Sequence, residues 1–409
     1  MKKLLALVLA LSLICLAGCA PSENADPAET QPASSDTDPG ASATEPGKQA
    51  VGGKILFMSN MNAGPQYEAY MAYLKMACDN LGYSYEVFFG DESNDPAGNL
   101  QATQNVMTND VVGLITTQDG GLAEIMAEYP DLYVAGFMSD MAGVFGEDGA
   151  AAACKESDHF LGTVADQCVN GSDLGKVYFD LVVEKGYKKV ATIAFPPFAY
   201  PQLMVADATF RGLVEEYNAT AAEPIEIVGE VEVLMFQPLS DAYFMDASHQ
   251  DLDAIIAPLA GCTFVYPALK AAIDSGVISG DTKLITSGFE TDPNLIADFG
   301  DDGVISAIVL GGVESMVWPV VMLDNAIQGA QFSDFSAPEA LDSALFVIDS
   351  KEDMDKVLSS SLLGTGDIAN AAASWDVISN LLVRNNPDAT YAGLKDFLSS
   401  DTLTVDGLK

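Results

Sequence analysis

Apolar positions in residues 54–117 follow two alternating spacings. Three short, continuous apolar runs have the length of β-strands, and they lie at residues 54–59, 84–89 and 111–116. Between these runs, apolar side chains recur every three or four positions, as on one face of a helix. This strand–helix–strand–helix–strand order predicts a parallel sheet with right-handed crossovers and helices on both faces.

Residues that begin or end helices occur at the boundaries of these stretches. Gly82 lacks a Cβ and can take the left-handed conformation of a helix C-terminus. Asp95-Pro96 provides an N-cap followed by a proline at the first helical position. A ligand on such a sheet lies beyond the carboxyl ends of the strands, which predicts a site at residues 59–67, 90–94 and 116–121.

An irregular Gly-, Ala- and Asp-rich segment at residues 139–167 interrupts this alternation of strands and helices. The alternation then continues to about residue 348. Its second run begins near residue 170, where we expect a strand region at 225–233 and a helix at 238–247. A chain of 409 residues with 49% hydrophobic content can bury more than one core. The pattern therefore predicts an α/β protein of two similar lobes.

The N-terminus has the pattern of an export signal. A basic start precedes an apolar run at residues 4–16 that is too short to span a membrane, and Leu-Ala-Gly-Cys follows at residues 16–19. These four residues resemble the bacterial lipoprotein cleavage box. The resemblance implies that residues 1–18 are a signal peptide and that Cys19 becomes the acylated first residue of the mature chain. The alternative is an ordinary secretory signal.

Residues 19–52 are rich in Pro, Ser, Thr, Ala and acidic residues and have little apolar bulk. Such a segment cannot bury enough surface to order itself, so we expect a disordered tether. We therefore expect an exported protein, anchored to the outer face of the bacterial cytoplasmic membrane by the lipid on Cys19.

The chain has 59 acidic and 18 basic side chains and a formal net charge of −41. This charge repels nucleic acid and anionic headgroups, which argues against either as a partner. A general acidity of the exported proteins of its source is the alternative explanation.

Neither a metal centre nor a catalytic site is predicted. Only two histidines are present, there is no Gly-x-Ser-x-Gly sequence, and Cys154, His159 and Cys168 lack the paired spacing of zinc ligands. Outside the cell, Cys154 and Cys168 could form a disulfide, with two free thiols as the alternative. We therefore expect no enzyme activity and no cofactor.

Several local sequences resemble those of the type I periplasmic binding proteins, the substrate-binding components of ABC importers. They include Asn62 with the following Pro-Gln-Tyr at 65–67, and the segments at 80–83, 111–115, 184–193 and 285–290. The family contains ribose- and galactose-type sugar binders and basic membrane protein-like nucleoside binders.

The resemblance implies two Rossmann-like, doubly wound lobes joined by three crossing segments. The N-terminal lobe would comprise residues 53–170 and 312–343, and the C-terminal lobe residues 171–311 and 344–409. A monomer would then bind a small molecule between the lobes and deliver it to an ABC permease in the membrane.

This chain departs from the sugar binders at positions that contact the sugar. Phe137-Met138-Ser139 replaces the Asp-Arg that ends a strand of the first lobe, and Gly261-Cys262 replaces an Asn-Asp in the second. Each buried hydroxyl left unpaired costs about 1–3 kcal/mol. The predicted cleft is therefore poor in partners for a typical monosaccharide.

Candidate ligand contacts are polar or aromatic residues near predicted strand ends. They are Asn62, Gln66, Tyr67, Gln118, Phe137, Phe198, Tyr200, Phe236 and Glu290. Aromatic faces could stack on a ring, and the alternative is that these rings belong to the lobe core. The polar residues could bond the ligand, and the alternative is that they stabilise turns.

These observations predict a lipid-anchored solute-binding protein for a sugar, a sugar-like molecule or a nucleoside. The first alternative is a ligand sensor for a membrane receptor. The second alternative is a surface enzyme on a Rossmann-like core, which the missing catalytic residues disfavour.

Overall fold

The computed structural model describes residues 52–91, 93–147, 149–165, 171–197, 200–289 and 291–408, which belong to one compact unit. The predictions about the signal peptide, the tether and Cys19 lie outside these residues. The same holds for Cys168, Phe198 and Glu290. No helix among the described residues is long and apolar enough to cross a membrane.

The first lobe is built on a parallel six-stranded sheet with the order β12-β5-β4-β3-β1-β2. Its strands are β1 (Lys54–Ser59), β2 (Ser84–Phe89), β3 (Val111–Thr116), β4 (Tyr133–Phe137), β5 (Phe160–Ala165) and β12 (Ala340–Asp342). The first three strands have the bounds that the hydrophobic pattern predicted. A parallel sheet with both faces covered by helices explains why these strands are continuous apolar runs.

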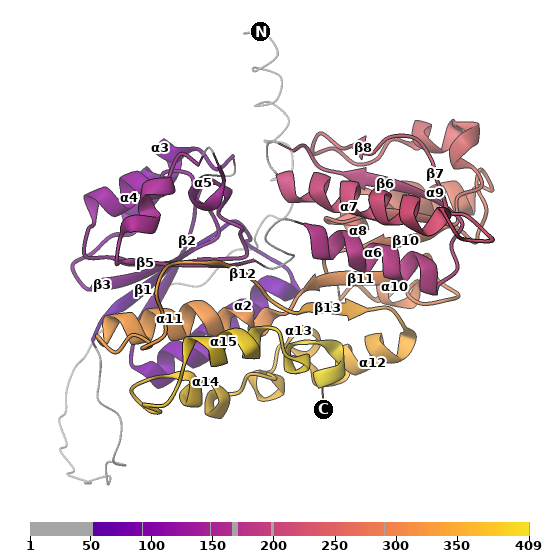
Figure 1. The fold of residues 1–409 in the computed structure, drawn as a ribbon. Coiled ribbons are helices and arrows are strands. Elements are labelled where there is room, and N and C mark those ends of the chain that lie inside the picture. Colours follow the sequence, from indigo (N-terminus) through magenta and orange to yellow (C-terminus); the bar gives the residue numbers. More distant parts are fainter. Residues whose placement is uncertain are drawn as a thin grey trace, which may run out of the picture. The chain divides into compact units, whose positions relative to one another are not determined.

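Helices cover both faces of this sheet, and Figure 1 shows α11 beside elements that are far earlier in the sequence. They are α2 (Pro65–Leu81), α3 (Pro96–Val106), α4 (Leu122–Glu128), α5 (Ala142–Phe145) and α11 (Val317–Ile327). Gly82 ends α2 in the left-handed conformation, with φ 85°. The Asp95 carboxylate accepts a hydrogen bond from the Gly98 N–H and caps α3. Both predicted helix boundaries are confirmed.

The second lobe contains a seven-stranded sheet with the order β13-β11-β10-β9-β6-β7, and β8 pairs with β6. Its strands are β6 (Lys189–Ala194), β7 (Glu226–Ile227), β8 (Glu232–Val233), β9 (Ala254–Ala257), β10 (Lys283–Thr286), β11 (Ile305–Gly311) and β13 (Leu345–Ile348). Among the described strands of this sheet, only β13 runs antiparallel to its neighbour, β11. The expected strand at 225–233 is two short strands, since residues 228–231 leave the sheet.

The helices of the second lobe pack on this sheet. They are α6 (Ser172–Glu184), α7 (Pro201–Asn218), α8 (Gly261–Phe264), α9 (Tyr266–Asp274) and α10 (Pro293–Ala297). The prediction of a helix at 238–247 is wrong, because the chain there forms the short 3-10 helix η2 (Asp241–Met245) and begins a second one, η3 (Ala247–His249). The prediction of an α/β protein with two mostly parallel sheets is confirmed.

Residues after β13 form a C-terminal segment. It contains α12 (Lys351–Ser360), α13 (Leu362–Thr365), η5 (Ile368–Asn370), α14 (Trp375–Leu381), α15 (Tyr391–Leu398), η6 (Asp401–Leu403) and η7 (Val405–Gly407). Although this segment follows a strand of the second sheet, α13, η5 and α14 contact α2, and α14 also contacts α11. The predicted lobe boundaries, including the assignment of residues 344–409, therefore stay a prediction.

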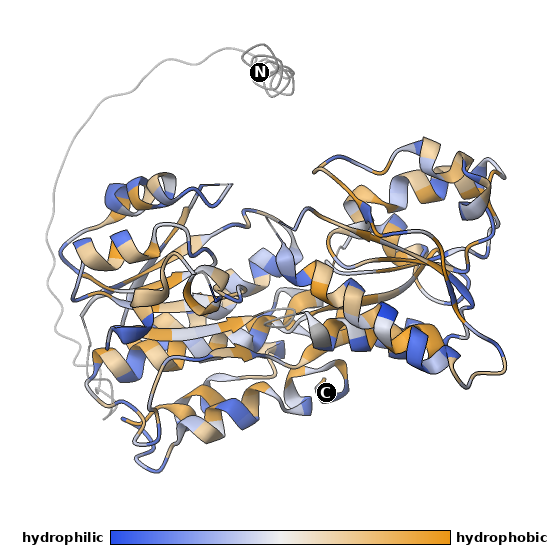
Figure 2. Ribbon diagram, turned by 45° about the horizontal axis from the view of Figure 1, so that its top comes forward, coloured by the Kyte–Doolittle hydropathy of each residue, from blue (hydrophilic) through white to orange (hydrophobic). Residues whose placement is uncertain are grey.

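Apolar side chains are concentrated in the strands, which are mainly orange in Figure 2, whereas many helices alternate in colour. One hydrophobic cluster contains residues of both sheets, such as Phe57 of β1 and Ile308 of β11, together with Trp318 of α11 and Leu394 of α15. A second cluster lies within the second lobe. The lobes therefore share one core on the side where the C-terminal segment lies.

Candidate functional site

A cavity of about 300 Å³ lies between loops that follow the strands of the two sheets. Its lining comes from both lobes and comprises Asn60, Met61, Ala63, Gly64, Pro65, Gln66, Met138, Tyr200, Gln202, Leu259, Ala260, Cys262, Thr263, Ser287, Gly288, Phe289 and Leu310. Most of these residues follow the carboxyl ends of β1, β4, β6, β9 and β10. Open α/β sheets bind ligands at this edge.

Four residues of the cavity lining have positive φ angles. The values are 98° for Gly64, 56° for Met138, 46° for Ala260 and 89° for Gly288. Left-handed backbone costs a residue with a Cβ about 1–2 kcal/mol, so Met138 and Ala260 are held there by their surroundings. Such strain is concentrated at functional sites, which makes it independent support for this cavity as the site.

The packing around Gly261 shows how one strained loop is held. Its N–H donates to Thr286 Oγ1 at 2.8 Å, and a Cβ at this position would lie 2.4 Å from the same oxygen. Only glycine allows α8 to approach β10 so closely. This contact fixes the neighbouring Ala260 and Cys262 at the cavity.

The cavity lining contains no Asp, Glu, Lys, Arg or His among the residues that the structure describes. Its polar groups include the side chains of Asn60, Gln66, Gln202, Thr263 and Ser287 and the hydroxyl of Tyr200, and some of them already have partners within the protein. Ser287 Oγ donates to the Pro258 carbonyl at 2.8 Å, and Gln66 Nε2 donates to Tyr70 Oη at 3.4 Å. The described lining therefore favours an uncharged ligand.

Of the predicted contact residues, Gln66 and Tyr200 line the cavity. Asn62 is exposed in the loop before α2, and Tyr67 is half-buried in the first turn of α2. Neither of these two side chains belongs to the lining. Gln66 and Tyr67 differ because each residue of a helix is turned by about 100° from the one before it.

Phe236 lies beside Tyr200, with ring centroids 6.5 Å apart, and both rings pack against Phe195. The Phe236 side chain is 43% exposed, and its φ is 56°. A left-handed aromatic residue is a backbone outlier. The structure thus brings two predicted aromatic residues together on the second lobe, and one of them lines the cavity.

Phe137 is fully buried in the core of the first lobe. Its ring meets the ring of Tyr70 edge to face at 5.0 Å and that of Phe57 at 6.3 Å. The next residue, Met138, turns into the cavity lining. Phe137 therefore lies behind the cavity, and its contact with a ligand stays a prediction.

Gln118 takes part in a network of loops at the ends of β2 and β3. It is 7% exposed, and its Nε2 donates to the Asp91 carbonyl at 2.6 Å. The neighbouring Asp119 carboxylate accepts hydrogen bonds from Asn94 Nδ2 at 3.0 Å and from the Gly143 N–H at 2.6 Å. These bonds join loops that lie 24 to 27 residues apart in the sequence, and a ligand contact of Gln118 stays a prediction.

Several residues of the cavity lining are not among the predicted contacts. They are Asn60, Met61, Ala63, Met138, Gln202, Ala260, Cys262, Thr263 and Ser287, among others. Only their position in the sequence could have indicated them, since most of them follow a predicted strand within a few residues. Met61 and Met138 carried no chemical signal because a methionine is an ordinary core residue.

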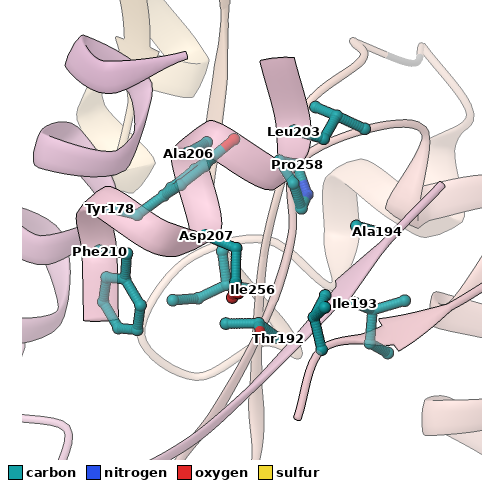
Figure 3. A pocket seen from close by; sticks show the side chains of 11 residues that line it. Tyr178, Thr192, Ile193, Ala194, Leu203, Ala206, Asp207, Phe210, Ile256 and Pro258 are labelled. Atoms are coloured by element: carbon teal, nitrogen blue, oxygen red, sulfur yellow. The ribbon is translucent and has the colours of Figure 1, made fainter. Parts of the chain in front are cut away.

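A second, internal pocket lies within the second lobe between α6, α7, β6 and β9 (Figure 3). Its volume of about 10 Å³ corresponds to a single water molecule. Asp207 points into this region and is paired through Oδ2 with Arg211 Nε at 2.8 Å, while Arg211 also donates to Thr192 Oγ1 at 2.8 Å. Arg211 therefore stabilises the lobe interior, away from the cavity.

No group of three His, Cys, Asp or Glu side chains suitable for a metal ion occurs within the described residues. The His159 ring stacks on Tyr133 at 4.3 Å. Cys154 is buried, and burial raises the pKa of its thiol. Whether Cys154 pairs with Cys168 stays a prediction, since Cys168 lies outside the described residues.

No protein-family model matches the chain, and no curated protein matches it. Several solved structures have a similar fold. The arabinose-binding protein AraP from Geobacillus stearothermophilus has a TM-score of 0.57 at 17% identity, covering 75% of this chain and 99% of its own. A periplasmic ribose ABC transporter protein from Conexibacter woesei has a TM-score of 0.55 at 14% identity, with coverages of 76% and 96%.

The glucose-galactose binding protein GanP from Geobacillus stearothermophilus is a third example, with a TM-score of 0.52 at 16% identity. It covers 74% of this chain and 99% of its own. At these identities the likeness concerns the fold alone. The chain therefore has the fold of the type I periplasmic binding proteins, as its local sequences indicated.

Proposed function

We propose that this protein is an extracytoplasmic solute-binding protein that captures a small molecule in the 300 Å³ cavity and delivers it to an ABC importer. The observation that carries the proposal is the convergence of loops from both sheets on one cavity, with strained backbone at Met138 and Ala260. The fold is one in which ligands bind between lobes, and the similar structures include binding proteins for arabinose and for glucose and galactose.

The ligand in this proposal is an uncharged molecule with a ring, either a sugar, a sugar-like compound or a nucleoside. Tyr200 lines the cavity and Phe236 is partly exposed beside it, so their faces can stack on a ring. Amides at Asn60, Gln66 and Gln202 supply donors and acceptors without a charge. The described lining offers no carboxylate or guanidinium to neutralise a charged ligand.

The proposal places the protein outside the cytoplasm, anchored through Cys19, with the lobe boundaries given by the sequence resemblance. Mass spectrometry of the protein extracted from membranes would detect a lipid on Cys19 after removal of residues 1–18. An unmodified mature N-terminus at another position would exclude the lipid anchor and leave the ordinary secretory signal.

Thermal unfolding of the purified protein with a panel of pentoses, hexoses, nucleosides and amino acids tests the binding function. A ligand that binds only the folded state raises the unfolding midpoint. At a free ligand concentration of about 100 times Kd, it adds about 2.7 kcal/mol to the free energy of unfolding. We expect stabilisation by at least one neutral ring compound and none by charged amino acids. Turnover of a compound without stabilisation by any member of the panel would favour the surface enzyme instead.

A further inference from the structure

The C-terminal segment, residues 349–408, is attached to the second lobe at its start. β13 pairs with β11 from Ile308 to Gly311, and Lys185 Nζ at the end of α6 donates to the Asp349 carbonyl at 2.6 Å. Lys356 Nζ of α12 donates to the Val405 carbonyl at 2.8 Å, which ties the segment's beginning to its end. The segment therefore starts as an extension of the second sheet.

The same segment then contacts the helices of the first lobe. Tyr73 Oη of α2 donates to the Ala373 carbonyl at 3.1 Å, and the Val383 N–H donates to Asn325 Oδ1 of α11 at 3.0 Å. Arg384 Nε lies 3.1 Å from Oδ2 of Asp324, a fully buried carboxylate of α11. α14 contacts both α2 and α11, and the three helices lie together in Figure 1.

Apolar packing reinforces these polar contacts. Ile378 and Leu382 of this segment are fully buried, and so is Leu394. They belong to the same cluster as Trp318 of α11 and Ile348 of β13. One continuous core thus joins the first-lobe helices, the C-terminal segment and the edge of the second sheet.

This core covers the point where the chain crosses between lobes. β11 ends at Gly311, and Gly312 leads into η4 (Val313–Met316) and α11. A Cβ on Gly312 would lie 2.9 Å from the Leu403 carbonyl. The Ala372 N–H approaches Glu314 Oε1 at 3.4 Å, so both ends of the crossing lie against this segment.

We propose that the C-terminal segment is a brace that holds the two lobes at one angle. Because the segment contacts both lobes, movement of the lobes about the crossing at Gly311–Gly312 must break its contacts with at least one of them. This inference goes beyond the proposed transport function and does not depend on it, because it concerns the angle between the lobes without ligand.

A distance measurement between the lobes tests the brace. Spin labels at Ala97→Cys on α3 and Glu216→Cys on α7 occupy exposed positions of the two lobes. The unmodified chain, treated with the same label, shows whether native cysteines react. We expect one narrow distance distribution for the labelled protein without ligand.

The decisive comparison uses two matched truncations of fully buried leucines. Leu382→Ala weakens the brace, whereas Leu269→Ala removes the same atoms from α9 in the core of the second lobe. Both should lower the unfolding midpoint, but only Leu382→Ala should broaden or shift the distance distribution. An unchanged distribution in Leu382→Ala, or the same broadening in both, would overturn the brace.

A milder variant covers the case in which Leu382→Ala does not fold. Asp324→Asn with Arg384→Gln removes both charges of the ion pair and shortens the side chain at 384. The expected result is again a broader distribution. A distance distribution identical to that of the labelled protein without these two substitutions would count against the proposal.

Discussion

The cavity and the shared core differ in what their residues do. Around the cavity, Met138 and Ala260 adopt left-handed backbone and the neighbouring Phe236 leaves an aromatic ring partly exposed. In the shared core, Trp318 and Leu394 are fully buried. The cavity thus holds strained and incompletely covered groups, whereas the core holds closely packed ones.

This difference follows from what each region must do. A binding surface has to remain accessible, so its residues gain little from burial and need support from their surroundings. The core that joins the lobes has no such demand and can bury large side chains. Stability and binding should therefore respond to different substitutions, and the following predictions test that separation from the largest effect to the smallest.

Truncating the largest buried side chain should have the greatest effect on stability. Trp318 is completely buried in the shared core, so Trp318→Ala should lower the free energy of unfolding by about 3–5 kcal/mol. Urea denaturation measures this loss. Phe236→Ala, at the partly exposed ring, serves as the contrast and should cost far less. Equal losses would contradict the distinction between the two regions.

Removing the aromatic ring that lines the cavity should affect binding more than stability. For a neutral ring compound identified by the thermal screen, Tyr200→Ala should weaken binding roughly tenfold through loss of stacking and burial. Calorimetric titration measures the change in Kd. Tyr129→Ala, after α4 and outside the cavity, is the control. A similar loss in both variants would show that the effect is not local.

The carboxylate of Glu314 should make the shared core sensitive to pH. Burial raises its pKa above the ordinary value, so the folded chain keeps a proton that the unfolded chain has released. Stability should therefore fall as the pH rises from about 4.3, the ordinary glutamate pKa, through the raised value. Glu314→Gln should be more stable than the unmodified protein at neutral pH and lose this advantage below about pH 4.

Urea denaturation of both proteins across this pH range provides the measurement. A constant difference in the free energy of unfolding between Glu314→Gln and the unmodified protein at every pH would contradict the proposed role of burial. Tyr73, whose hydroxyl lies near this carboxylate, titrates above the range and should not contribute.

Relieving backbone strain should give the smallest effect. Ala260 has φ 46°, which glycine adopts freely, so Ala260→Gly should stabilise the protein by up to about 1 kcal/mol. Ala257→Gly, in the neighbouring strand β9, should destabilise it, since that backbone is extended. Thermal unfolding distinguishes the two. Destabilisation by both variants would show that Ala260 stores no strain.

The hydrophobic pattern predicted the strands β1, β2 and β3 with their bounds because each is an apolar run bounded by turn residues. Short-range chemistry also placed the ends of helices at Gly82 and Asp95. These features depend on neighbouring residues alone. Of the three loops that the pattern predicted for the site, the loop after β1 lines the cavity through residues 60, 61 and 63–66, whereas none of residues 90–94 or 116–121 belongs to the described lining.

The individual contact residues stay predictions, and their positions depend on more than the local pattern. Phe137 packs in the core, and the next residue, Met138, lines the cavity through a left-handed turn that methionine rarely adopts. Gln118 lies after a strand like a ligand contact, yet its amide bonds the Asp91 carbonyl. Such one-residue differences depend on packing between distant segments, which a local pattern does not contain.

Filling the cavity is the most direct test of the proposal that it binds the ligand. Ala63 is exposed and lines the cavity, so Ala63→Trp should abolish calorimetric binding of the screened compound while the unfolding midpoint stays unchanged. Ala97→Trp, on the exposed surface of α3, should bind like the unmodified protein. Unchanged affinity in Ala63→Trp would contradict the assignment of the cavity as the binding site.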